Sequence, residues 1–475
     1  MAFVKKLLSR FFGDRNNREV SSGIFWMFMV KGGALLVSVL IVPAYMDYFS
    51  DESVYGAWRT VSSVFLWMNM FDFGIGNGLR NYLVKTLASK DDEASKKYIS
   101  SAYVSVGVIS LAFLVVGLVI VFALNWNSIM DIPENVVSAL TFKVFVAIVY
   151  SGVVFHFFFL LISSVCYALQ KSFLPSLISL ITQIMLLLFL FIPNAWDVSG
   201  KVVGLSIMYF VAYNLPILIL TLILFGGPLK RMKPSIKWLD KTMAKNVMGL
   251  GGIFFVIQIA MLAMNSSNEV YITTFFGTEY IQSYDSYYKL FYVLMMMVTL
   301  VLQPIWSAIT KAYCEKRFTW LRKIYFALYG LGFILCVITV AFALLYQPIA
   351  DLWLGKGALI VNTFDVTTFT LLTAAGIICN ITNSFSNGLG KLKCQLICTV
   401  AGALLKLVLV FVLVNVLENP TWSIVVLSNF LAMLPLLIVH PIYIARFIQK
   451  ELTRAKNSAG AQDTSSDNLL MEDKE

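Results

Sequence analysis

The chain has few charged residues, few histidines and no ordered set of cysteines. Charged residues make up 13% of its 475 positions, against about 25% in soluble domains. Its two histidines, His156 and His440, lie among aliphatic or aromatic neighbours, and its six cysteines are scattered. Their spacing matches neither a disulfide framework nor a zinc site. We therefore expect no metal site and no cofactor.

Enzyme motifs are also missing from the sequence. The run from Gly388 to Leu392 superficially resembles a phosphate-binding loop. However, Phe385 stands where the first glycine is required, and Leu392 replaces the Ser or Thr. With no nucleotide site and no catalytic residues, we expect a transporter. Its driving force would be an ion gradient, the substrate gradient or another subunit.

Long apolar runs dominate the chain instead. Apolar residues account for 59% of the sequence, and a helix needs about 20 of them to cross a hydrocarbon core. The sequence predicts an all-α integral membrane protein with about twelve transmembrane helices, near residues 22–46, 54–72, 101–124, 143–166, 173–193, 202–226, 249–275, 281–307, 325–347, 366–388, 395–416 and 422–445.

The basic residues support this helix count, because they collect in every second loop. Arg80 to Lys97, Lys230 to Lys245 and Lys311 to Lys323 are rich in Lys and Arg, whereas the alternate loops hold little more than Lys201 and Lys356. Lys and Arg accumulate on the cytoplasmic side of a membrane. The pattern predicts that both termini are cytoplasmic.

The two halves of the chain repeat short motifs in the same order, such as Leu169-Gln170-Lys171 and Leu389-Gly390-Lys391. Two halves of six helices each share one orientation, with a pseudo-two-fold axis along the membrane normal. The predicted organisation is a cytoplasmic N-terminus (1–21), an N-lobe (22–226), a cytoplasmic linker (227–248), a C-lobe (249–445) and a cytoplasmic tail (446–475), partly disordered from Ser458 onwards.

The linker between the lobes is strongly basic. The pattern from Ile236 to Lys241 suits an amphipathic helix that lies on an anionic leaflet. A solvated linker would have the same composition, so the sequence leaves both interpretations open.

Six charged residues fall inside predicted spanning helices, where charges are costly and usually face a protein interior or water. They are Lys31, Arg59, Glu269, Asp285, Lys289 and Lys406. Asp285 and Lys289 are four residues apart and can neutralise each other, so cations remain in excess. This excess predicts a cavity for a phosphate or pyrophosphate. The alternative is that cations near helix ends, Arg59 above all, reach out to the interface.

Polar residues line single faces of several predicted helices. Asn265 and Glu269 share a face of the seventh helix, Asn380 lies on a polar face of the tenth, and Lys406 on that of the eleventh. These side chains are candidates for lining the substrate cavity, and Glu269 is also a candidate for ion coupling. Hydrogen bonding between helices would produce the same pattern. Prolines at 43, 216, 304 and 435 interrupt predicted helices.

The most specific motif is Asp72-Phe73-Gly74-Ile75-Gly76-Asn77-Gly78-Leu79-Arg80-Asn81, which closes the second helix. It resembles the second-helix signature of O-antigen and polysaccharide flippases, in the multidrug/oligosaccharidyl-lipid/polysaccharide exporter superfamily. Further similar segments are Tyr287 to Phe291, Gln303 to Trp306 and Asn387 to Lys391. For the motif itself we expect a structural role, in which Gly74, Gly76 and Gly78 permit a tight turn and Asp72 caps the segment after it.

The resemblance implies a V-shaped pair of six-helix lobes around a cationic cavity. It also implies that the chain flips an undecaprenyl-pyrophosphate-linked oligosaccharide to the outer leaflet of the bacterial inner membrane by alternating access, as an antiporter. Its partners would be that glycan, the lipid bilayer and other polysaccharide-assembly membrane proteins, with no nucleic acid.

Three other functions remain open. Lipid II flippases of the same superfamily usually have fourteen helices and an arginine-rich cavity. Multidrug extruders mostly carry organic cations, which a cationic cavity disfavours. A membrane glycosyltransferase or polymerase usually has a large outer loop, whereas the longest one predicted here covers only residues 125–142.

Overall fold

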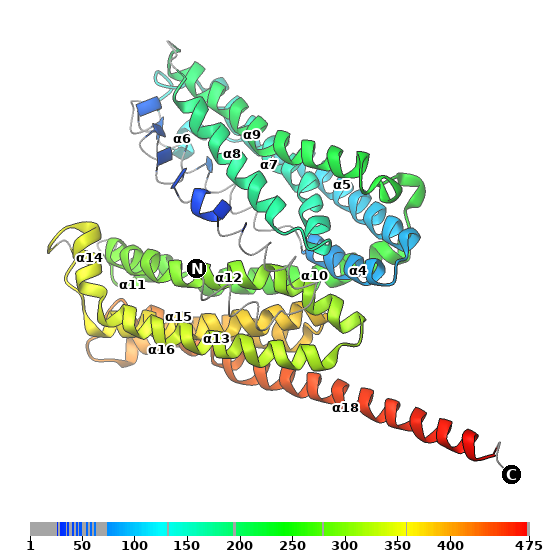
Figure 1. Ribbon diagram of the computed structural model, residues 1–475. Coiled ribbons are helices and arrows are strands. Elements are labelled where there is room, and N and C mark those ends of the chain that lie inside the picture. Colours follow the sequence, from blue (N-terminus) through cyan, green and yellow to red (C-terminus); the bar gives the residue numbers. More distant parts are fainter. Residues whose placement is uncertain are drawn as a thin grey trace. The chain divides into compact units, whose positions relative to one another are not determined.

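The computed structural model describes residues 74–472, apart from short gaps at 131–132, 193–195, 278–279 and 358 (Figure 1). It also describes scattered positions from Trp26 to Ser62. All regular elements in these parts of the chain are helices. Ten of the described helices are long and apolar enough to span a membrane. They coincide with the third to twelfth predicted windows, which confirms a multi-pass, all-α membrane protein. The first two windows lie largely outside the described residues.

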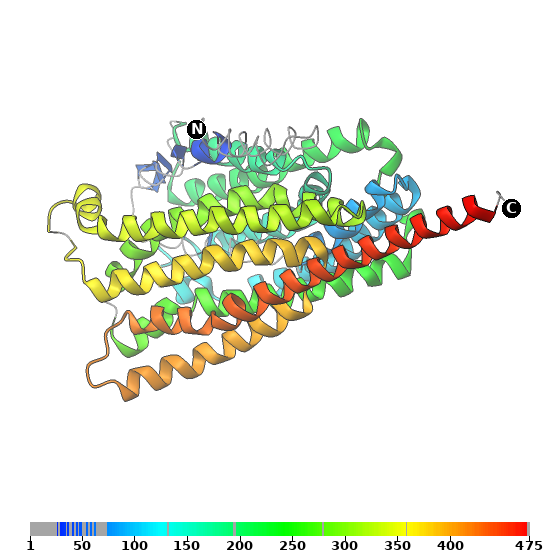
Figure 2. The ribbon, with the colours of Figure 1, turned by 60° about the horizontal axis from the view of Figure 1, so that its bottom comes forward.

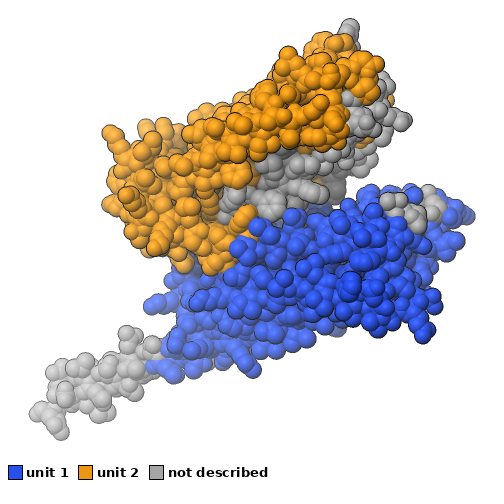
Figure 3. Space-filling model, turned by 180° about the vertical axis from the view of Figure 1, so that it is seen from behind, with its two compact units in different colours: residues 1–14, 256–475 blue, residues 15–255 orange. Residues whose placement is uncertain are grey.

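Two compact units make up the chain. The one that comes first along the chain, called the first unit below, covers residues 15–255 and is drawn in orange in Figure 3. Its helix α7 (Ala139–Ala168) packs against five other helices of this unit, and 56% of the most apolar stretch of α7 is buried. A central helix of this kind needs apolar residues all round, and α7 has them. From residue 74 to Gly226, the described helices of this unit are α4 (Ile75–Ala88), α5 (Asp92–Ala123), α6 (Trp126–Met130), α7 (Ala139–Ala168), α8 (Phe173–Leu190) and α9 (Val198–Gly226).

The second compact unit includes residues 256–475 and has its own central helix, α15, with the same buried share of 56% (Figure 2). Helices α12, α13, α17 and α18 all pack against α15. The helices of this unit are α11 (Asn268–Phe275), α12 (Ile281–Cys314), α13 (Phe318–Leu344), α14 (Tyr346–Leu354), α15 (Thr363–Leu389), α16 (Lys393–Val416), α17 (Ile424–Ala432) and α18 (Leu434–Glu472).

Helix α10 (Lys241–Asn265) belongs to both units, because the boundary falls between Phe255 and Val256. The basic linker therefore groups with the first unit. It does not form the amphipathic helix expected from Ile236 to Lys241. It contains two short 3₁₀ turns, η1 (Lys230–Met232) and η2 (Ile236–Trp238). Asp240 explains this difference in part, because its Oδ1 accepts the amides of Thr242 and Met243 and so caps α10 at the point where the expected helix would have to continue.

Helix α18 extends to Glu472, and the partial disorder expected from Ser458 onwards stays a prediction. The prolines within helices differ in effect. Pro216 and Pro304 lie inside continuous helices, whereas Pro435 lies at the break between α17 and α18.

Four tight turns join neighbouring helices by the same geometry in both units. Each contains a residue with a positive φ angle, namely Lys90 (58°), Gln170 (60°), Lys316 (56°) and Gly390 (67°). In each, the next amide donates to a carbonyl five residues earlier, as in a Schellman motif. The bonds are Asp91 N to Thr86 O, Lys171 N to Cys166 O, Arg317 N to Ala312 O and Lys391 N to Ser386 O. The motif repeat in the sequence therefore marks a repeated turn.

The glycine motif forms both a turn and a close helix contact within the first unit. Gly74 has a φ angle of 64° and precedes α4 directly, a conformation that glycine adopts readily. A Cβ atom at Gly78 would lie 2.6 Å from Val247 O of α10, and one at Gly251 would lie 3.0 Å from Ile75 Cα. Small residues on both helices thus let two backbones approach each other.

The other two motif residues have different places. Gly76 is buried in the first turn of α4. Asp72, the expected cap, lies outside the described residues.

Replacing Gly78 with alanine tests the helix contact. We expect Gly78→Ala to destabilise the protein by about 1–3 kcal/mol, because its Cβ would overlap a backbone oxygen. Thermal unfolding in detergent measures this change. Gly249→Ala on α10 is the control, since a Cβ there meets nothing within 4 Å, and alanine favours a helix by up to about 1 kcal/mol. Equal shifts in both variants would contradict the contact.

Candidate functional site

The most buried of the predicted cations lies at a break in the seventh spanning helix. Helix α10 ends at Asn265 and α11 begins at Asn268. Lys406 of α16 reaches this break, where its side chain is 1% exposed. The ammonium donates to Met264 O, to Ser267 Oγ at 2.9 Å and to Asn268 Oδ1 at 2.6 Å. We call these four residues the Lys406 cluster.

The three acceptors use all three hydrogens of the ammonium. Met264 O lies at the C-terminal end of α10, where the helix dipole is negative and favours a cation. The Tyr271 ring lies 5.5 Å from Lys406 Nζ and adds a cation–π contact. Asn268 Nδ2 also donates to Tyr284 Oη at 3.1 Å, so the cluster connects α16, the broken helix and α12. In this structure Lys406 joins helices and offers no free donor to a ligand.

A second broken helix packs beside this cluster. The break between α17 and α18 follows Ala432, and a Cβ at Gly402 of α16 would lie 2.5 Å from Ala432 O. On α17, Asn429 is 1% exposed and donates to Asn265 Oδ1 at 3.3 Å. Breaks in paired helices near polar side chains are typical of transporter binding sites. Asn265 itself is exposed, so it belongs to the rim of this region.

The predicted acidic candidates lie close to the cluster but on exposed surface. Glu269 is exposed on the first turn of α11. Asp285 and Lys289 form the ion pair expected from their spacing, at 3.4 Å, with side chains 41% and 62% exposed. The carboxylates of Glu269 and Asp285 are near enough to repel each other. Asp285 thus has a cationic partner, whereas Glu269 has none among the described residues.

Three candidates are not part of the Lys406 cluster. Lys31 is half-buried in a helical stretch of the first unit, and Asn380 is half-buried on α15. Arg59 lies outside the described residues. Within the second unit, the structure brings together Lys406, Asn265, Glu269 and Asp285.

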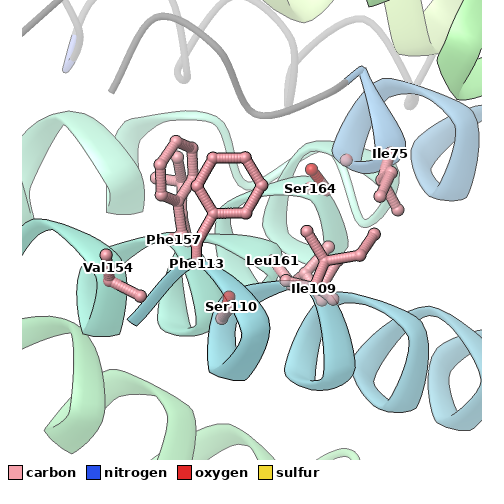
Figure 4. A pocket seen from close by; sticks show the side chains of 11 residues that line it. Ile75, Ile109, Ser110, Phe113, Val154, Phe157, Leu161 and Ser164 are labelled. Atoms are coloured by element: carbon pink, nitrogen blue, oxygen red, sulfur yellow. The ribbon is translucent and has the colours of Figure 1, made fainter. Parts of the chain in front are cut away.

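A pocket in the first unit has a different character. It lies between α4, α5 and α7, and apolar side chains such as Phe113, Phe157 and Leu161 line it (Figure 4). The described lining has only Ser110 and Ser164 as polar side chains and contains no charge. Its cavity of about 20 Å³ has room for little more than one water molecule, so it is no substrate site as it stands. Across the described residues, no three His, Cys, Asp or Glu side chains are placed to hold a metal ion.

Several site residues were not singled out from the sequence. Ser267 and Asn268 are ligands of the Lys406 ammonium, and Tyr284 contacts Asn268 in turn. The run Asn265-Ser266-Ser267-Asn268, four polar residues inside an apolar window, is the signal that indicates this break. Arg80 lies in a segment that was expected to be a charged loop. Its side chain is instead buried, 2% exposed, with Cζ 4.9 Å from the centroid of the Tyr167 ring.

Comparison with known proteins supports the fold and gives no closer relative. No family model and no curated protein matches the sequence. The structure is similar to an outward-facing multidrug resistance MATE family transporter of the MOP superfamily, with a TM-score of 0.74 and 14% identity, over 94% of this chain and 98% of that one.

Two further solved structures are similar. A MOP superfamily transporter from Pyrococcus furiosus, whose binding pocket of reverse polarity suggests a different function, has a TM-score of 0.73 and 15% identity, over 94% of this chain and 98% of that one. The MATE transporter VcmN from Vibrio cholerae, in its bent form, has a TM-score of 0.63 and 15% identity, over 93% and 99%.

These likenesses are all under 25% identical, so they show the fold alone. The chain has the fold of a multi-pass, all-α membrane protein. More specifically, that fold is similar to the one of the MATE family transporters, in which twelve transmembrane helices form two lobes.

Removing one ligand of Lys406 tests the cluster. We expect Asn268→Leu to destabilise the protein by about 1.5–3 kcal/mol, because a buried ammonium loses an acceptor. Thermal unfolding in detergent measures the loss. Asn415→Leu on α16 is the control, since Asn415 is exposed and bonds only to Phe411 O of its own helix.

The double variant Asn268→Leu/Lys406→Met then separates charge burial from lost packing. Without the ammonium, part of the loss should be recovered, because no charge is left buried without its acceptor. Strictly additive losses would contradict the assigned role of the cluster.

Proposed function

We propose that the chain flips a polyprenyl-pyrophosphate-linked oligosaccharide, such as an O-antigen or other surface-polysaccharide repeat unit, across the bacterial inner membrane. Both termini would be cytoplasmic, and the glycan would move to the outer leaflet by alternating access. Two features support this function. The motif from Gly74 to Asn81 resembles that of polysaccharide flippases, and the fold is one that transporters share.

Lys31 is the observation that carries the proposal. It is half-buried in an apolar helical stretch and has no ion pair or hydrogen bond in the described part of the chain. A cation in a spanning segment is costly unless an anion or water compensates it. A pyrophosphate supplies that anion, so we assign the substrate contact to Lys31.

Lys406 takes a different role in this proposal. Its three donors are already used by Met264, Ser267 and Asn268. It would fix the break in the seventh helix and so position the rim residues Asn265 and Glu269. Loss of Lys406 would then lower the amount of folded protein before it lowers the affinity for substrate.

Reconstitution into liposomes tests the function. We expect wild-type protein to move a labelled polyprenyl-pyrophosphate glycan between leaflets. Lys31→Gln should slow this movement by about tenfold to a hundredfold, the equivalent of one lost charge-assisted hydrogen bond. Lys31→Arg, which keeps the charge, should retain most of the activity.

Lys143→Gln is the matched control, because Lys143 only donates to Phe122 O at an exposed site. Equal rates for wild type and Lys31→Gln would refute the assigned contact. Absence of glycan movement in a well-folded wild-type protein would refute the function itself.

An organic-cation extruder is the second candidate, and Glu269 is the observation that favours it. Its exposed carboxylate has no cationic partner among the described residues, and it could attract a cationic drug or a proton. The similar structures include a multidrug resistance transporter. A fluorescent organic cation added to the same liposomes discriminates the two functions. Transport of the cation that Glu269→Gln abolishes, without glycan movement, would select the extruder.

A further inference from the structure

The basic linker lies at a membrane surface by necessity. Helix α9 ends at Gly226 and α10 begins at Lys241, and both helices are membrane spans. The fourteen residues between them must therefore stay close to the headgroups of one leaflet, because both ends of this short segment are fixed at the membrane surface.

This segment packs against the first unit through specific hydrogen bonds and one buried side chain. Ser100 Oγ of α5 accepts the Ser235 amide at 3.1 Å. Ser101 Oγ accepts the Asp240 amide at 3.0 Å and donates to Asp240 O at 3.1 Å. Leu229 is 6% exposed in the apolar core that α4, α5 and α7 share. Figure 1 shows the segment against the start of α5. These contacts exclude the solvated linker.

The charges of the segment are left free to face outward. Six basic residues are exposed, namely Lys230, Arg231, Lys233, Lys237, Lys241 and Lys245. The single acid, Asp240, is used locally, because its Oδ1 accepts the amides of Thr242 and Met243. On the adjoining turn of α5, Glu93 is paired with Lys97 at 2.6 Å. In the same turn, Asp91 Oδ1 accepts the Ala94 amide and Asp92 is exposed. The six cations of the segment outnumber these acids, so the surface is cationic.

Apolar side chains project from the same segment. Ile236 is 79% exposed and Leu239 is 41% exposed. Trp238 lies between them, and Lys96 Nζ stands 4.4 Å from its ring centroid, so the ring is held in place. Isolated exposed apolar residues are common, but a pair flanked by six cations, beside two spanning helices, matches the composition of an interfacial anchor.

We propose that residues 229–245 form a binding surface for anionic phospholipid headgroups, with Ile236 and Leu239 inserted among the acyl chains at the interface. The cations neutralise lipid phosphates, and the 3₁₀ turns present them at a fixed height because α5 holds the backbone. The occupant is the bilayer itself, since both ends of the segment enter it. This surface is separate from the proposed substrate contact at Lys31.

Hydrogen–deuterium exchange of the full chain in nanodiscs tests the surface. The amides of residues 229–240 are compared in discs of phosphatidylcholine alone and of phosphatidylcholine with an equal part of phosphatidylglycerol. We expect exchange to be at least about fivefold slower with the anionic lipid, the effect of one basic residue near a charged leaflet. High salt should remove the difference, because it screens surface charge.

Two variants and a control sharpen the test. K230Q/R231Q/K233Q should abolish the lipid dependence, and Ile236→Ser should speed exchange in both kinds of disc. The control K316Q/R322Q/K323Q removes three exposed cations, one from the turn between α12 and α13 and two from the start of α13, and should keep the dependence. Equal exchange in the two lipids, or loss of the dependence in the control, would overturn the proposal. Neither readout requires a transported substrate, so the result is independent of the proposed function.

Discussion

A broken helix inside a membrane leaves backbone carbonyls that must find donors, because the hydrocarbon offers none. The break after Asn265 meets this demand with the ammonium of Lys406, which binds Met264 O and two side chains of the break. Burial of a charge is offset here by the helix dipole and by three oriented acceptors. Around this joint, Gly402 permits close packing of α17, and Asn268 carries the contact on to Tyr284. The second unit keeps its irregular backbone because these partners exist.

Hydropathy predicted most of the fold, because the span of an apolar helix is set by the thickness of the bilayer. Ten predicted windows correspond to helices, but several helices extend beyond them, as α5 and α12 do at their polar ends. A window records only the apolar part of a helix. The role of Lys406 was not predictable in the same way, since its partners lie about 140 residues away in the chain. The sequence identified the charge as unusual, but only the fold shows what it binds.

Some of the turns between helices were predictable from the sequence and others were not. Gly390 predicts a helix end by its own chemistry, whereas Gln170 and Lys316 adopt the same positive φ angle without such a signal. Their geometry comes from the helices that they connect. The expected repeat between the two halves helped here, because the matched motifs at Gln170 and Gly390 occupy equivalent turns. The structure of the linker was harder to predict, since its composition suited both an amphipathic helix and a solvated segment. The hydrogen bonds of Ser100 and Ser101 to the linker backbone show that it is neither.

The two proposed functions differ in the charge that would meet the substrate. Lys31 lies in the first unit and Glu269 in the second, each without a neutralising partner among the described residues. Under these proposals, selectivity would depend on which of the two unpaired charges the substrate meets.

The four αL turns have a consequence for how the chain is made. Three of them join two spanning helices through a connection of a few residues, so α7–α8, α12–α13 and α15–α16 are tight helical hairpins. The fourth joins the 14-residue α4 to the span α5. Because the connection is so short, the second helix of a hairpin cannot stay outside the bilayer after the first helix has entered it. During synthesis the two helices of each pair would enter the membrane together, and a lengthened turn would uncouple their insertion.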